Sequence, residues 1–167
     1  AVAMMPMAIV AASAPNLGSG VHIRSRSGTA WTETATIPVP TDATAMRFDS
    51  TGSRLVVGLA GGNGEARVFS RTGTTWVHEA TLLPSGEPTP GTGFGSAVTL
   101  SGDGLWSAIG APTGAYFDPV PGGGVWLYAR LGAGWVGLGV FGPEVDGNPD
   151  RFGCSVALDG TGEWLVI

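Results

Sequence analysis

Short apolar segments alternate with turn-forming residues along the whole chain. Three of these segments read alike: VHIRSRSGTAW ending at Trp31, ARVFSRTGTTW ending at Trp76 and VWLYARLGAGW ending at Trp135. In each of them the Trp stands ten residues after the first residue of the segment. A pattern that recurs at fixed spacing is typical of repeat architectures. We therefore expect successive copies of one structural unit.

Further segments surround each of these copies. Upstream lie AIVAASAP ending at Pro15, LVVGLA ending at Ala60 and SAIGAP ending at Pro112. Earlier still come short apolar pieces, three of which run into the turn sequences DSTG, SGDG and DGTG. A fourth segment follows each Trp and ends in Pro. Apolar runs bounded by Gly, Pro, Asp and Ser indicate β-strands, so the unit is predicted to be four short antiparallel strands.

A four-stranded unit repeated along the chain predicts an all-β fold, a β-propeller, in which each sheet packs against its neighbours around an axis. We expect about three and a half blades, at approximately residues 1–40, 41–88, 89–145 and, partial, 146–167. Solenoids and two-sheet sandwiches are the rival folds, but neither usually repeats a four-strand cassette of this length. An incomplete set of blades predicts that more of the same chain, or another subunit, completes the ring.

Composition narrows the function classes. The 167 residues include 29 Gly and 12 Pro, and 43% are hydrophobic, which is compatible with a packed β-structure. All eight basic residues are Arg, scattered without a basic run, and the net charge is −5, so we expect no nucleic-acid partner. No apolar run reaches the ~20 residues that span a bilayer. The single cysteine, Cys154, is predicted to be a small buried hydrophobe.

The segment FGSAVTLSGDGLWSAIGAP, which contains Phe94, Gly95, Gly110, Ala111 and Pro112, resembles the FG-GAP repeat of integrin-type propellers. RFGCSVALDGTGEWLVI resembles the start of the next repeat, with Phe152 and Gly153 at the FG position. This resemblance implies a ring of seven blades in which the motif residues are mainly architectural. Members of the family often bind calcium in a D-x-D-x-D-G loop, whereas the turns here are short and poor in oxygen ligands, so we expect no cofactor.

Few residues suggest metal or catalytic chemistry. Asp146, Asn148 and Asp150 have the spacing of the first calcium ligands, but no Gly and Glu follow at the required positions, so they are only weak metal candidates. The only histidines, His22 and His78, both lie in strand patterns and do not indicate a Ser-His-Asp triad. We therefore predict no catalytic residues. Trp31, Trp76 and Trp135 recur at one position and are predicted to pack between strands.

Loop lengths vary on one predicted face of the propeller. The loops between second and third strands and between blades differ in length, whereas the turns at the other end are uniform. Because recognition residues often lie on variable loops of a rigid scaffold, we expect ligand contacts on this face, with neutral loop drift as the alternative. The candidate contact residues are Tyr116, Phe117, Asp118, Glu87, Asp146 and Asp150.

These observations predict a non-catalytic recognition or structural module, not an enzyme, that binds a protein or glycan in adhesion or in a surface assembly. The expected location is extracellular or on the surface of a cell or particle. The alternatives are an accessory propeller domain of a larger extracellular enzyme and, third, an enzyme within the propeller. The setting rests on family analogy.

Overall fold

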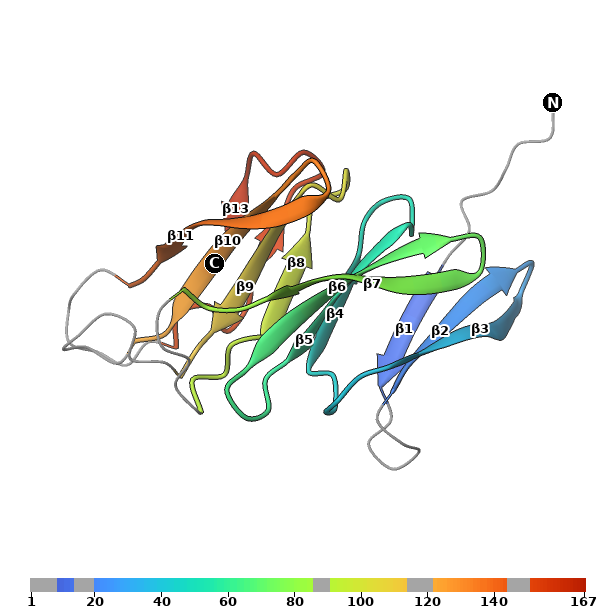
Figure 1. Ribbon diagram of the computed structural model, residues 1–167, viewed down its shortest axis with the longest axis horizontal. Coiled ribbons are helices and arrows are strands. Elements are labelled where there is room, and N and C mark those ends of the chain that lie inside the picture. Colours follow the sequence, from blue (N-terminus) through green and yellow to red (C-terminus); the bar gives the residue numbers. More distant parts are fainter. Residues whose placement is uncertain (1–8, 14–19, 86–90, 114–121, 144–150) are drawn as a thin grey trace.

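The computed structural model describes residues 9–13, 20–85, 91–113, 122–143 and 151–167. Within these ranges the protein is built from β-strands and turns. The strands form four antiparallel sheets, and in each sheet the hydrogen-bonded neighbours are consecutive in the chain. Figure 1 shows the sheets following one another in chain order across the molecule. The predicted all-β propeller fold, with repeated blades, is confirmed.

The first two sheets, here called blades 1 and 2, contain seven strands. Blade 1 consists of β1 (Ile9–Ser13), β2 (Gly20–Ser27) and β3 (Ala30–Pro38). Blade 2 consists of β4 (Ala45–Phe48), β5 (Arg54–Leu59), β6 (Glu65–Thr72) and β7 (Thr75–Leu82). The turns within them contain Gly at positive φ, such as Gly28 and Gly73, a conformation that other residues rarely adopt.

The remaining strands form blades 3 and 4. Blade 3 consists of β8 (Ala97–Leu100), β9 (Trp106–Ala111), β10 (Gly124–Leu131) and β11 (Gly134–Phe141). Blade 4 contains the short pair β12 (Ala157–Leu158) and β13 (Leu165–Val166). Blades 2 and 3 therefore have the predicted four strands in meander order.

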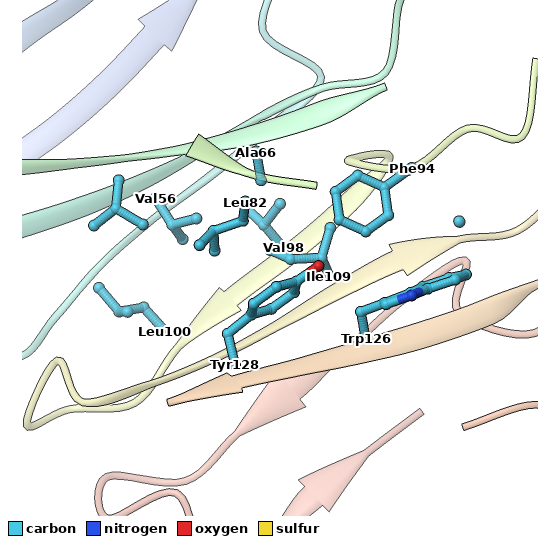
Figure 2. Packing of buried hydrophobic residues seen from close by; sticks show 11 residues of the cluster. Val56, Ala66, Leu82, Phe94, Val98, Leu100, Ile109, Trp126 and Tyr128 are labelled. Atoms are coloured by element: carbon cyan, nitrogen blue, oxygen red, sulfur yellow. The ribbon is translucent and has the colours of Figure 1, made fainter. Parts of the chain in front are cut away.

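Both faces of a blade are buried against neighbouring blades. In β5, Leu55 and Val57 belong to the apolar cluster between blades 1 and 2, whereas Val56 belongs to the cluster between blades 2 and 3. Alternate residues of a strand point to opposite faces of the sheet, so one strand contributes to two cores. Figure 2 shows the second of these clusters, where Val56 and Leu82 of blade 2 approach the aromatic and aliphatic residues of blade 3. This packing explains why the strand is a continuous apolar run.

Burial falls from the middle strands of a blade to its last strand. β9 is buried from its second residue to its end, whereas β11 is exposed at most positions. Trp76 and Trp135, on the last strands of blades 2 and 3, are half-buried and pack against the apolar clusters. Trp31 is 44% exposed, and because no described residues lie on that side of blade 1, its packing role stays a prediction. Cys154 is exposed, also against expectation.

Candidate functional site

A pocket of about 470 Å³ lies among the first strands of blades 2, 3 and 4. Strand β8 contacts both β4 and β12, so the first strands of the three blades lie side by side. The pocket is lined by residues of these strands and by the turns that follow them: Met46, Arg47, Phe48, Asp49, Ser50, Leu100, Gly102, Leu158, Asp159 and Gly160. Concave sites where repeated elements converge are typical ligand sites. We therefore take this pocket as the candidate functional site.

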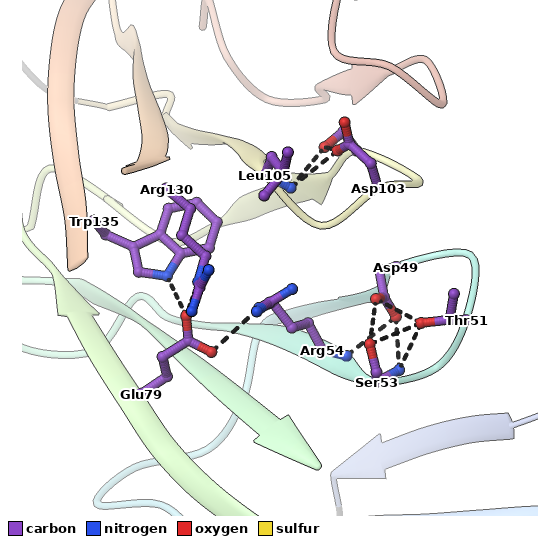
Figure 3. A network of polar contacts seen from close by, with 10 residues as sticks. Asp49, Thr51, Ser53, Arg54, Glu79, Asp103, Leu105, Arg130 and Trp135 are labelled. Atoms are coloured by element: carbon purple, nitrogen blue, oxygen red, sulfur yellow. Dashed lines mark hydrogen bonds and ion pairs between the residues drawn. The ribbon is translucent and has the colours of Figure 1, made fainter. Parts of the chain in front are cut away.

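The turn beside β4 is fixed by the buried carboxylate of Asp49. Its Oδ1 accepts hydrogen bonds from the backbone N–H groups of Ser53 at 2.8 Å and Arg54 at 3.1 Å. Its Oδ2 accepts from the hydroxyls of Thr51 at 2.8 Å and Ser53 at 2.7 Å (Figure 3). Four donors on one carboxylate hold the turn in a single shape. The DSTG sequence therefore positions the wall of the pocket.

The corresponding turns of blades 3 and 4 are built in the same way. Asp159 accepts hydrogen bonds from the Trp164 N–H at 3.1 Å and from the Thr161 hydroxyl at 2.8 Å. In blade 3 a serine takes this place, and its hydroxyl oxygen accepts from the N–H of Trp106 at 2.9 Å. A carboxylate or hydroxyl at the first turn position thus gives the three turns a common structure.

Hydrogen bonds between turns join the three blades beneath the pocket. The Ser50 N–H donates to the Gly102 carbonyl at 2.9 Å, and the Asp103 N–H donates to the Gly160 carbonyl at 3.1 Å. The Ser50 hydroxyl donates to the same Gly102 carbonyl at 2.6 Å. These bonds cross from one blade to the next, so the relative placement of the pocket walls is fixed by backbone atoms.

Arg47 is the group in the pocket that is open to a ligand. Its side chain is exposed, and within the described residues no carboxylate lies at ion-pair distance from its guanidinium. The backbone N–H of Trp164 and the Thr161 hydroxyl, which donate to Asp159, hold the pKa of that carboxyl below its usual range. Asp159 therefore stays ionised near neutral pH. The arrangement can bind an oxygen-rich ligand through the Arg47 guanidinium.

A second polar centre joins blades 2 and 3 outside the pocket. The Glu79 carboxylate on β7 accepts hydrogen bonds from Arg54 Nε at 3.2 Å, from Trp135 Nε1 at 3.0 Å and from Arg130 Nε (Figure 3). Arg54 belongs to blade 2, whereas Arg130 and Trp135 belong to blade 3. The Glu79 side chain is 10% exposed. One carboxylate therefore binds two cations and an indole across the boundary between blades.

The charge state of Glu79 follows from two opposing effects. Burial raises the pKa of its carboxyl, but the hydrogen bonds from Arg130 and Trp135 and the charges of the two arginines lower it, and the net pKa is below its ordinary value. The ionised form is thus the one that the fold stabilises.

The FG-type residues lie at the boundaries between blades. Phe94 is fully buried and its ring meets that of Trp126 edge-on at a centroid distance of 5.5 Å. Gly95 and Gly153 have positive φ and lie against the backbone of the preceding blade. Phe152 donates its N–H to the Gly122 carbonyl at 2.8 Å. The remaining motif residues, Gly110, Ala111 and Pro112, are buried at the end of β9.

The histidines singled out in the sequence lie apart from the pocket. His22 is at hydrogen-bond distance from Glu33, 3.2 Å, and His78 from the Thr81 hydroxyl, 3.0 Å. The hydrogen bond with His22 is the largest influence on Glu33, whose carboxyl pKa is lowered. Within the described ranges, no three His, Cys, Asp or Glu side chains gather as a metal site would require.

The loop candidates fall elsewhere. Tyr116, Phe117, Asp118, Glu87, Asp146, Asn148 and Asp150 lie outside the described residues. Their predicted roles in ligand or metal binding stay predictions.

The sequence interpretation missed Arg47 and Glu79. A signal was available for Arg47, because it is a charged residue between two apolar ones in a first strand, where the equivalent residues of blades 3 and 4 are the uncharged Thr99 and Ala157. For Glu79 no local signal exists, since Arg130 is 51 residues away in the chain.

A scan against protein-family models finds no family that matches, and a search of curated proteins finds no match. A solved structure, that of the periplasmic gluconolactonase PpgL of Pseudomonas aeruginosa, is similar with a TM-score of 0.59. The two chains are 15% identical, and the similarity covers 94% of this chain and 45% of that one. At this identity the similarity shows a shared fold. The present chain therefore spans less than half the length of the protein that it resembles.

The comparison corrects the prediction of a non-catalytic module. A protein with this fold is an enzyme by name, so the repeat pattern does not support the conclusion that the chain is not an enzyme. The physical reason is that a site assembled from several blades leaves no compact catalytic motif in any one repeat. The absence of such a motif from the sequence therefore does not argue against catalysis.

In the described part of the chain, no helix is long and apolar enough to cross a membrane.

Proposed function

We propose that this chain is part of the propeller of a larger enzyme that acts outside the cytoplasm, and that the pocket at β4, β8 and β12 contributes to its substrate site. The observation that carries the proposal is a polar pocket with an accessible cation in a fold shared with a periplasmic gluconolactonase. Further blades, from the same chain or from another subunit, would complete the ring. The seven-blade ring and the FG-GAP relationship belong to this proposal.

The chemistry of the pocket suits a lactone of a sugar acid. Such a substrate carries a carbonyl and several hydroxyl oxygens, all of which accept hydrogen bonds from a guanidinium. Attack of water on the carbonyl places negative charge on its oxygen, and a fixed cation stabilises that charge. In this proposal Arg47 binds the lactone and stabilises the developing oxyanion.

A group that activates the water must come from elsewhere in the ring. Asp49 already accepts four hydrogen bonds from its own turn. Asp159 also accepts hydrogen bonds that hold its turn, and its pKa, which is below the ordinary value, makes its carboxylate a weak base. The proposed division of work is therefore that this chain binds and orients the substrate, while a residue beyond the described part acts as general base.

The test measures hydrolysis of glucono-1,5-lactone by the full-length protein in a pH-indicator assay, against the spontaneous rate in the same buffer. Arg47→Met is expected to lower kcat/KM by at least about tenfold, the loss of roughly one charge-assisted hydrogen bond. The matched control is Arg26→Met, because Arg26 is also exposed and lies on β2, away from the pocket.

Three outcomes separate the parts of the proposal. Absence of catalysed hydrolysis together with absence of lactone binding would overturn it. Binding without hydrolysis would support the accessory-propeller alternative. If Arg47→Met leaves hydrolysis unchanged, the protein is an enzyme but this pocket is not its substrate site.

A further inference from the structure

The three blades with a complete last strand carry one bulge at the same place. Pairing between the third and fourth strands shifts register between Ile23 and Arg24, between Val68 and Phe69 and between Leu127 and Tyr128. The residue left without a partner is Thr34 in blade 1, Glu79 in blade 2 and Leu138 in blade 3. These three residues are therefore structural equivalents, and a β-bulge directs the side chain of its extra residue out of the regular ladder.

A cross-strand pair of Arg and Trp is also repeated. Arg71 lies opposite Trp76 in blade 2, and Arg130 lies opposite Trp135 in blade 3. At the boundary of blades 2 and 3, the bulge residue Glu79 places its carboxylate on Arg130 and Trp135. The boundary of blades 1 and 2 has the same Arg and Trp, but its bulge residue is the short, uncharged Thr34.

A pocket is found where the missing carboxylate would lie. Its volume is about 170 Å³, and it is lined by Ser25, Thr34, Arg71, Gly73, Thr74 and Trp76. The Thr34 hydroxyl donates to the Ile23 carbonyl of its own blade at 3.3 Å, so it is directed away from the role that Glu79 performs. The pocket thus combines the Arg and Trp of blade 2 with a wall from blade 1.

The two donors of this pocket are available. Within the described residues, no carboxylate lies at ion-pair distance from Arg71, whose guanidinium carbon is 5.8 Å from the centre of the Trp76 ring. No hydrogen bond from the Trp76 indole N–H to a described residue is present either, in contrast to Trp135. A guanidinium stacked near an aromatic ring is pre-organised for a planar anion.

We propose that this pocket binds a carboxylate group of a ligand, held by Arg71 and Trp76 as Glu79 is held by Arg130 and Trp135. The ligand is either a small carboxylic acid or an Asp or Glu side chain of a protein partner, because both present the same planar anion. Partial enclosure between two blades raises the strength of the ion pair above that of a fully exposed pair. This site is separate from the proposed substrate pocket and does not depend on it.

The test is a titration of the full-length protein with sodium propionate, followed by the ¹H–¹⁵N resonance of the Trp76 indole, which Trp76→Phe assigns. Sodium chloride at equal ionic strength is the blank. A saturable shift of the Trp76 indole resonance with propionate, and not with chloride, is expected. No saturable shift with either propionate or the peptide described below would overturn the proposal.

Two variants test whether the ligand binds in this pocket. Thr34→Glu introduces at the bulge of blade 1 the glutamate that blade 2 has at Glu79. Its carboxylate is expected to pair with Arg71 and so to weaken propionate binding at least tenfold. Leu138→Glu adds the same charge at the equivalent, exposed bulge of blade 3 and is expected to leave binding unchanged. Equal binding by wild type and Thr34→Glu would overturn the proposal.

A second pair of ligands distinguishes the sources of the carboxylate. The peptide acetyl-Gly-Glu-Gly-amide is compared with its Gln counterpart. Binding of the Glu peptide at least tenfold tighter than propionate assigns a protein partner, and the reverse order assigns a small acid. Equal binding of the Glu and Gln peptides, together with no effect of propionate, would contradict a carboxylate site.

Discussion

Gly58 of blade 2 and Gly95 at the start of blade 3 lie so close that neither has room for a side chain. A β-carbon on Gly58 would lie 2.0 Å from the Gly95 carbonyl oxygen, and one on Gly95 would lie 2.9 Å from the Leu59 nitrogen. The same relationship recurs one blade later, where a β-carbon on Gly110 would lie 2.0 Å from the Gly153 carbonyl oxygen. Gly95 and Gly153 thus contact Gly58 and Gly110, which occupy the same position in the second strands of blades 2 and 3, and blades pack through these contacts.

The first prediction concerns this contact. Gly58→Ala should lower the free energy of unfolding by about 3 kcal/mol, because the added methyl group forces the two backbones apart in a packed boundary. Gly139→Ala is the control, since a β-carbon there has no neighbour within 4 Å and Gly139 has no positive φ. It should change stability by less than about 1 kcal/mol. Urea denaturation of both variants measures the difference, and equal stability would contradict the packing role.

The second prediction concerns the carboxylate that joins blades 2 and 3. Glu79→Gln should lower the free energy of unfolding by about 2 kcal/mol at neutral pH, because two arginines lose the charge that they bind. Glu33→Gln is matched to it, since Glu33 also pairs with basic side chains but is 43% exposed. That control should leave stability almost unchanged, because solvent screens an exposed ion pair. A larger loss in the control than in Glu79→Gln would reject the assigned importance of this network.

The fold was largely predictable from sequence because each strand is encoded by its own apolar run and its own turn. The DSTG, SGDG and DGTG turns and the recurring Trp give the length and order of strands locally. Contacts between blades are not encoded in this way. Trp76, for example, packs against the apolar cluster between blades 1 and 2, so its burial depends on residues of the neighbouring blade.

The sites were less predictable for the same reason. The pocket around Arg47 forms only where the first strands of three blades meet, and the ion pair of Glu79 forms only because Arg130 approaches from the next blade. Thr34 and Glu79 become comparable once the bulge is located by strand pairing, and bulges leave no clear mark in apolar patterns.

The third prediction is a pH dependence that arises at Glu79. Its pKa in the folded protein is below the ordinary value, so its ionised form contributes stability that is fully present above about pH 4.3, the ordinary pKa of Glu. That contribution should be lost as the pH falls through the lowered pKa. The difference in free energy of unfolding between wild type and Glu79→Gln should therefore shrink on acidification. Denaturation curves from pH 7 to pH 3 test this, and a difference that stays constant or grows toward acid would contradict it.

The fourth prediction concerns the turn that forms the wall of the pocket. Asp49→Ala should lower the free energy of unfolding by about 2 kcal/mol, because it leaves two backbone N–H groups of a partly buried turn without their acceptor. Asp49→Ser should cost less, since Ser101 performs the same task in blade 3 by accepting hydrogen bonds from Leu105 and Trp106. Asp42→Ala, at an exposed position, is the control and should be near neutral. If Asp49→Ser proved as damaging as Asp49→Ala, the three turns would not be interchangeable, and the shared construction of the pocket walls would have to be abandoned.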